Sequence, residues 1–230
     1  MANKQDVQNI FNDIAPKYDA LNHILSMNID KIWRKKAINY IHDCKNIKLL
    51  DVACGTGDFS IAAYKKGVRD IKGIDISKNM VDIGNKKIIN LGLDESIQLF
   101  EGDSEDINFP EEFFDYTTVA FGVRNFEHLE KGLTDMYRIL KIGGKIIILE
   151  FSMPEKSPFK QLYKFYFRRI LPIVGGWISG NKQAYTYLPN SVLQFPQGKD
   201  FLAIMNKCGY SNCVQKKLSF GIASIYIGEK

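Results

Sequence analysis

The sequence predicts an α/β domain built on a mostly parallel, seven-stranded sheet with helices on both faces and a helical cap at the N-terminus. From Lys48 onward, short apolar runs alternate with segments of helical periodicity, which is typical of a parallel sheet with crossover helices. A glycine turn follows the first apolar run. The length of 230 residues fits one domain, and 45% hydrophobic and 25% charged residues exclude a disordered chain.

The N-terminal residues 1–45 are expected to form the cap. The apolar residues of its first helix recur at the spacing of one helix face: Val7, Ile10, Phe11 and Ile14. Pro16 is expected to end this helix, and a second helix is expected from about Ile29.

Regular elements are then expected in alternation. The predicted strands are 48–53, 71–76, 97–101, 115–121, 145–151, 211–218 and 222–227. The predicted helices are 59–66, 78–90, 129–140 and 199–208. Gly143 and Gly144 predict a sharp turn before the fifth strand, and the last two strands are expected to form a hairpin at the sheet edge.

The turn after the first strand carries the clearest functional signal. Asp51 is followed by Gly55-Thr56-Gly57 and a helix start, and Asp75 ends the next strand. Glycines let a ligand approach the backbone, and a helix N-terminus offers free N–H groups. An acidic residue 20 positions after the first glycine can accept hydrogen bonds from both ribose hydroxyls of a nucleoside. The alternative is a tight turn that needs glycine for its backbone alone.

The glycine pattern separates two nucleoside classes. A dinucleotide fingerprint requires a third glycine where this chain has Ser60, which argues against a nicotinamide oxidoreductase. The segment from Asp51 to Gly57 instead resembles motif I of class I S-adenosylmethionine-dependent methyltransferases, which have a Rossmann-like fold. Asp103 and Ser104 follow the third strand, where such enzymes hold the adenine ring. Asp103 can also be an ordinary Asx-turn residue.

Several further segments narrow the resemblance to one family. They are Tyr18-Asp19-Ala20-Leu21-Asn22, Asp30-Lys31-Ile32-Trp33-Arg34, Phe121-Gly122-Val123-Arg124-Asn125-Phe126, Ala184-Tyr185-Thr186-Tyr187-Leu188-Pro189, Phe195-Pro196-Gln197-Gly198 and Phe220-Gly221-Ile222-Ala223-Ser224. Together they resemble the bacterial quinone-biosynthesis C-methyltransferases that convert demethylmenaquinol to menaquinol. Some members of this family also act on a ubiquinol precursor.

The resemblance implies S-adenosylmethionine as cofactor, with contacts at Thr56, Asp75, Asp103 and Ser104. Some members have a serine where this chain has Ala120, so only a backbone contact is expected there. The motif also places Asp51, Gly55 and Gly57 at the cofactor. No metal is expected.

The chain is expected to form a single domain with four parts. They are a helical cap (1–45), a cofactor-binding core (46–152), a lid or substrate region (153–190) and a C-terminal helix with two strands (191–230). The expected reaction transfers a methyl group to a ring carbon of a prenylated demethylmenaquinol. Methylation of a ubiquinol precursor or of another small aromatic or carboxylic substrate is the alternative.

A ring carbon becomes nucleophilic when a neighbouring hydroxyl loses its proton, so the substrate is expected to be the reduced quinol. Arg124 follows the fourth strand, and we expect it to stabilise the oxyanion or to orient a water molecule, with Asn125 assisting. The alternative for Arg124 is an ion pair that holds the loop. Tyr185, Tyr187 and His23 are expected at the substrate pocket. The alternatives are packing under the lid for the tyrosines and a helix-surface or capping role for the histidine.

Charge is distributed unevenly along the chain. Residues 1–150 hold 20 Lys and Arg against 23 Asp and Glu, whereas residues 151–230 hold 11 against 3, a net of +8. This basic last third is suited to nucleic acid, an anionic membrane surface or an acidic partner. Its aromatic stretch 159–177 is expected to hold the isoprenoid tail and to contact an anionic bilayer; the alternative is a lid helix packed on the domain or on a second subunit. The nucleoside pocket favours an enzyme over a nucleic-acid-binding protein. The sequence leaves open whether the chain forms a homodimer.

The cellular address is also predicted. The four cysteines are too irregular for a disulfide framework, and no apolar run approaches the roughly 18 residues of a membrane span. We therefore expect a cytoplasmic protein with a peripheral contact on the cytoplasmic face of the membrane.

Overall fold

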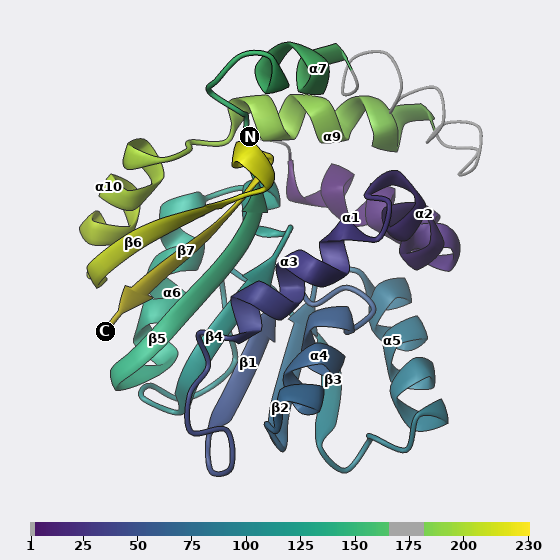
Figure 1. Cartoon of the computed structure of the whole chain (residues 1–230). Helices are drawn as coiled ribbons and strands as arrows, with labels where there is room; N and C mark the ends of the chain where they lie inside the picture. The colour runs from purple at the N-terminus through teal and green to yellow at the C-terminus, as the bar shows by residue number, and fades with distance from the viewer. Residues whose placement is uncertain (1–2, 166–181) are drawn as a thin grey trace.

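A seven-stranded sheet forms the centre of the computed structural model, which describes residues 3–165 and 182–230 (Figure 1). The strands are β1 (Lys48–Val52), β2 (Asp70–Asp75), β3 (Ile97–Glu101), β4 (Phe114–Ala120), β5 (Leu140–Phe151), β6 (Ser211–Leu218) and β7 (Ala223–Glu229). Their order is β3-β2-β1-β4-β5-β7-β6. The strands from β1 to β5 pair in parallel, and β7 is antiparallel to β5 and β6. The expected mostly parallel sheet and its C-terminal hairpin are confirmed.

Helices cover both faces of this sheet, as predicted. They are α1 (Lys4–Ile14), α2 (Tyr18–Leu25), α3 (Ile29–Ile38), α4 (Asp58–Lys66), α5 (Lys78–Asn90), α6 (Leu129–Ile139), α7 (Phe159–Phe165), α9 (Lys182–Gln194) and α10 (Lys199–Lys207). Side chains alternate along each strand, so neighbours in β1 point to opposite faces. Leu49 packs in the cluster of α3, α4 and α5, and Leu50 packs in the cluster of α6 and α10. Both leucines are fully buried, so helices cover the strand on both of its faces.

The N-terminal cap contains one helix that the sequence pattern did not predict. Pro16 does end α1, but a short 3₁₀ turn, η1 (Ala15–Lys17), leads directly into α2. Proline is tolerated there because the first residues of a helix need no N–H donor. Asn12 joins the cap to the start of α5. Its side-chain oxygen accepts a hydrogen bond at 2.7 Å from the hydroxyl of Ser77, the N-cap residue of that helix.

The expected turn at Gly143 and Gly144 lies inside β5 rather than before it. The strand begins at Leu140, and its pairing with β4 shifts register across this segment. Gly143 has the left-handed φ of 78° that a turn requires, and its N–H donates to the carbonyl of Lys230 at 2.9 Å. The prediction was wrong about the strand boundary because this bulge keeps its hydrogen bonds to the chain end.

Two expectations concern the C-terminal third. Of the aromatic and basic stretch 159–177, α7 lies within the described residues and the remainder lies outside them. Among the helices that the structure describes, none has the length and apolarity that crossing a bilayer requires.

Candidate active site

The turn between β1 and α4 has the backbone that its glycines predicted. Gly55 has a φ of 55° and Gly57 a φ of 80°, both in the left-handed region that glycine adopts freely. Gly55 lines the pocket described below. A Cβ atom on Gly57 would instead lie 3.1 Å from Cδ1 of Leu99. Gly57 therefore serves the packing of the turn against β3, and it is not among the residues that line the pocket.

Asp75 joins this turn to the end of β2. One oxygen of its carboxylate accepts the N–H of Gly55 at 2.8 Å, and the other accepts the N–H of Ser77 at 2.8 Å. Burial raises the pKa of Asp75, and the two N–H donors partly offset that rise. Each oxygen keeps a free lone pair, and the side chain lines the pocket. Asp75 can therefore hold the turn and accept the hydroxyl groups of a ribose together.

Asp51 has a different place from the one its motif predicted. Its carboxylate is fully buried and accepts hydrogen bonds from the hydroxyls of Ser60 at 2.7 Å and Thr118 at 2.9 Å. Burial raises its pKa to about 6, against the lowering effect of these two hydroxyls. Asp51 is not among the pocket-lining residues, so it ties β1 to α4 and β4 beneath the site.

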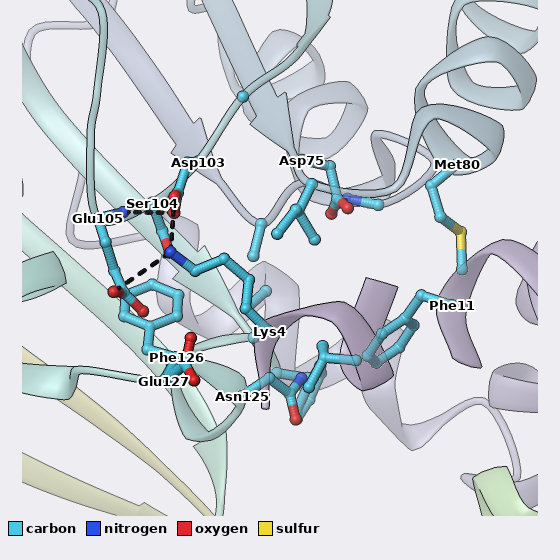
Figure 2. A pocket seen from close by; sticks show the side chains of 18 of the residues that line it. Lys4, Phe11, Asp75, Met80, Asp103, Ser104, Glu105, Asn125, Phe126 and Glu127 are labelled. Atoms are coloured by element: carbon cyan, nitrogen blue, oxygen red, sulfur yellow. Dashed lines mark hydrogen bonds and ion pairs between the residues drawn. The ribbon is translucent and has the colours of Figure 1, made fainter. Parts of the chain in front are cut away.

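A pocket lies at the carboxyl ends of β1, β2, β3 and β4, where the strand order changes direction (Figure 2). Ligands of open α/β sheets bind at such switch points. The sheet side contributes Ala53, Gly55, Asp75, Ile76, Gly102, Asp103, Ser104, Glu105, Ala120, Phe121, Gly122, Asn125, Phe126 and Glu127, and Met80 comes from α5. The predicted positions Gly55, Asp75, Asp103, Ser104 and Ala120 therefore meet in one pocket.

The other wall of the pocket comes from the cap, through Lys4, Val7 and Phe11 of α1 together with Tyr18 of α2. The cavity left between this wall and the sheet has a volume of about 60 Å³. The wall formed by α1 therefore covers the site closely.

Asp103 makes an Asx-turn hydrogen bond and also lines the pocket. Its Oδ1 accepts the N–H of Glu105 at 2.9 Å, which is an Asx-turn bond, and its side chain lines the pocket. The ammonium of Lys4 lies 2.7 Å from its Oδ2 and 3.4 Å from Glu105 (Figure 2). The sequence pattern did not predict the role of Lys4, because 99 residues separate it from its partner.

Thr56 was expected at the cofactor, but its hydroxyl is used elsewhere. It donates a hydrogen bond to Asp19 of α2 at 2.5 Å. The Lys87 ammonium lies 3.1 Å from the same hydroxyl and 2.8 Å from Asp19. Thr56 is 2% exposed and is not among the pocket-lining residues. In this arrangement it connects the cap to the glycine turn.

Arg124 and Asn125 belong to η2 (Val123–Asn125), the 3₁₀ turn after β4. The guanidinium of Arg124 forms a buried ion pair with Glu150 at 2.8 Å and also donates to the carbonyl of Phe121. Burial raises the pKa of Glu150, and the positive charge of Arg124 partly offsets this rise. Arg124 is not among the pocket-lining residues. The structure therefore places it in the loop-holding ion pair that was the alternative expectation.

Asn125 does line the pocket, and its side chain is hydrogen-bonded to Tyr187 of α9. The Tyr187 hydroxyl donates to the Asn125 side-chain oxygen at 2.9 Å. Tyr187 itself is not among the pocket-lining residues. Tyr185 belongs to α9 and His23 to α2, and the side chains of both lie outside the described part of the structure.

The fold has many relatives among solved structures. The crystal structure of the [4+2]-cyclase SpnF covers 100% of this chain with a TM-score of 0.75 at 14% identity, and the chain covers 97% of it. A SAM-dependent methyltransferase of Thermotoga maritima covers 97% of this chain with a TM-score of 0.67 at 16% identity, and 99% of that protein is matched. Because a cyclase and a methyltransferase share it, the fold alone does not determine the reaction.

The site residues narrow the class. Asp75 with its free lone pairs, the glycine turn beside it and Asp103 at the next strand end lie in one pocket at the carboxyl edge of the sheet, in the order expected for a nucleoside cofactor. Together with the fold, they define a class I S-adenosylmethionine-dependent methyltransferase.

Sequence comparison gives the family. The model of the ubiE/COQ5 methyltransferase family matches residues 1–230, and the chain belongs to that family. Demethylmenaquinone methyltransferase of Bacteroides fragilis is 41% identical over 227 residues, which are 98% of this chain and 93% of that protein. The ubiquinone/menaquinone biosynthesis C-methyltransferase UbiE of Geotalea daltonii is 44% identical over 228 residues, covering 98% of this chain and 97% of that one.

Proposed function

We propose that this enzyme transfers a methyl group from S-adenosylmethionine to a ring carbon of demethylmenaquinol and so produces menaquinol. The observation that carries the proposal is the position of Asn125. Asn125 lines the same pocket as Asp75 and Asp103, so a residue with an amide donor lies beside the residues that we propose to bind the nucleoside. The name of the 41% identical Bacteroides relative supports the quinone as acceptor.

S-adenosylmethionine supplies an electrophilic methyl group on a positively charged sulfur. Asp75, Gly55 and Asp103 bind and orient its nucleoside, which places the methyl group toward the acceptor. The S–CH₃ bond breaks as a C–C bond forms to the quinol ring. The ring carbon gives up its hydrogen as a proton, and the net reaction releases one proton to solvent.

The acceptor carbon needs electron density from the neighbouring hydroxyl group. We propose that the amide N–H of Asn125 donates to the oxygen of that group as it becomes negative, which is oxyanion stabilisation by a fixed donor. Arg124 contributes through the backbone that it holds, because its charge is paired with Glu150. The quinol then lies between η2 and the expected substrate region 153–190.

A ubiquinol precursor is the second candidate substrate. The Geotalea relative, at 44% identity, is named for both ubiquinone and menaquinone biosynthesis. Both acceptors are hydroxylated rings, so the same Asn125 donor serves either one.

We also propose a peripheral contact with an anionic bilayer, because a prenylated substrate resides in the membrane. Phe220 is 73% exposed and Phe165 is 62% exposed. They belong to η4 (Ser219–Gly221) and α7, which lie beyond the same end of the sheet as the pocket (Figure 1). Lys156 and Lys160, which precede Phe165 in the chain, are exposed, and their charges complement anionic headgroups.

The test uses the purified protein, methyl-labelled S-adenosylmethionine and a short-tailed demethylmenaquinol kept reduced. We expect label in the ring of the quinol and none in the oxidised quinone, which lacks the activating hydroxyl. A reduced ubiquinol precursor is assayed in parallel. No label in the reduced quinol while S-adenosylmethionine still binds would overturn the assignment.

A further inference from the structure

Helix α9 contacts two residues of η2 through two of its own side chains, which lie one helical turn apart. The Tyr187 hydroxyl donates to Oδ1 of Asn125 at 2.9 Å, and Nε of Arg124 donates to the Ser191 hydroxyl at 3.3 Å. Residues four apart share one face of a helix, so a single docked face of α9 contacts two consecutive residues of η2.

The hydrogen bond from Tyr187 determines which end of the Asn125 amide faces the pocket. An asparagine side chain has an acceptor oxygen and a donor NH₂ group, and rotation about its last bond exchanges them. With the oxygen occupied by Tyr187, the NH₂ group is the end left for the pocket. In Figure 2 the amide oxygen of Asn125 points away from Asp75 and Asp103.

The phenol is suited to this role because it stays protonated. Burial raises the pKa of Tyr187, with an opposing effect from Arg124 and a supporting one from Glu150. A protonated hydroxyl donates to the amide oxygen, whereas in the flipped amide it would accept from the NH₂ group and its own hydrogen would lose this acceptor.

We infer that Tyr187 is a positioning residue for methyl transfer, which fixes the Asn125 amide with its NH₂ group toward the acceptor oxygen. This inference rests on the proposed function, in which Asn125 contacts the quinol. Tyr187 acts through Asn125 because its own side chain is outside the pocket wall. The dependence on Asn125 separates this role from the ring contact that the sequence predicted for Tyr187.

The first experiment compares Tyr187→Phe with the wild type in the labelled-methyl assay on reduced demethylmenaquinol. Removing an oxyanion donor costs roughly 100- to 1,000-fold in kcat, so loosening that donor should cost about 10-fold. The KM for the quinol and the Kd for S-adenosylmethionine should stay within about 2-fold, since the donor acts mainly on developing charge. A kcat equal to that of the wild type would overturn the inference.

Tyr210→Phe is the matched control. It also removes one buried hydroxyl, which donates to the carbonyl of Leu133 at 3.0 Å, and it lies outside the pocket. We expect a lower Tm with unchanged kcat. A similar loss of kcat in this control would show that any buried hydroxyl is needed and would overturn the specific role of Tyr187.

The second experiment combines Tyr187→Phe with Asn125→Ala. Because Tyr187 acts through Asn125, the double variant should have the same kcat as Asn125→Ala alone. A further 10-fold loss would show that Tyr187 acts independently and would overturn the inference. Wild-type protein that methylates no quinol overturns the proposed function itself. An active wild type with unchanged kcat in Asn125→Ala overturns the role of the amide, and with it this inference, but leaves methyl transfer to the quinol standing.

Discussion

The proposed cofactor side and the proposed acceptor side of the pocket are built in different ways. The cofactor side comes from the ends of three neighbouring strands, and Asp75 bonds directly to the backbone of the glycine turn. The acceptor side is assembled from distant segments, since Asn125 depends on Tyr187, 62 residues further along the chain. Backbone geometry therefore determines the first half of the site, and contacts between separate helices determine the second.

The ion pair between Arg124 and Glu150 lies where these two halves meet. Glu150 is fully buried on β5 and also accepts the backbone N–H of Phe151 at 2.7 Å. It accepts the N–H of Arg124 at 3.4 Å as well. The pair thus joins η2 to the sheet, so changes to it should affect the whole acceptor side before they affect the cofactor.

The largest expected effect is that of Arg124→Ala. It leaves the Glu150 charge buried without its partner, which typically costs about 3–5 kcal/mol in the free energy of unfolding. We expect that loss in urea unfolding at pH 7, together with lower turnover and a nearly unchanged Kd for S-adenosylmethionine. Lys141→Ala, which removes a partly exposed ion pair with Asp115, is the control and should cost less than about 1 kcal/mol.

The contrast between the two halves of the pocket is contradicted if Arg124→Ala lowers turnover without lowering the free energy of unfolding. That result would place the guanidinium on the reacting atoms, as the sequence first predicted. Equal loss of cofactor affinity and turnover would also contradict the division of the pocket into two halves.

The next effect concerns pH and the cofactor side. The pKa of Asp51 is raised to about 6, above the roughly 3.9 of an unfolded chain. The folded state therefore binds more protons between about pH 4 and 6, and this group lowers stability as pH rises through that window. Two pKa units correspond to about 3 kcal/mol.

Asp51→Asn removes that titration, and its amide can still bond to the hydroxyls of Ser60 and Thr118. Relative to the wild type, we expect the variant to gain up to about 3 kcal/mol in unfolding free energy between pH 4 and pH 7. Chemical unfolding at several pH values measures this difference. Parallel curves of unfolding free energy against pH for the two proteins would show that the pKa of the buried Asp51 carboxyl is not raised.

Asp75→Asn tests the cofactor side directly. Hydrogen bonds to a charged group contribute about 1.5–3 kcal/mol each, so losing the carboxylate should weaken S-adenosylmethionine binding roughly 100-fold. Calorimetric titration checks this. Asp70→Asn, at the opposite end of the same strand, should bind as the wild type does. Equal affinity in both variants would remove Asp75 from the cofactor site.

Local pattern predicted the sheet, the glycine turn and Asp75, because these depend on strand order and on residues close in sequence. It did not predict that the hydroxyl of Thr56 bonds to Asp19, since that contact depends on how the cap docks. Arg124 was placed correctly after the fourth strand, but its partner Glu150 looked like any strand residue. The one signal that could have indicated the pair is the carboxylate at the end of an apolar run that is expected to be buried, because a buried charge needs a partner.

The smallest expected effect belongs to Lys4, which connects the cap to the cofactor side. Its ammonium occupies Oδ2 of Asp103, the atom expected to accept from the adenine amine, and the pair is about one-third exposed. A pair of this kind contributes about 0–1 kcal/mol, so Lys4→Met should tighten S-adenosylmethionine binding by about 2- to 5-fold. Lys78→Met removes an exposed ion pair with Asp82 on α5 and should leave the affinity unchanged. If Lys4→Met instead weakens binding, the ammonium stays at the site with the cofactor, and α1 is a lasting part of the cofactor wall rather than a competitor for Asp103.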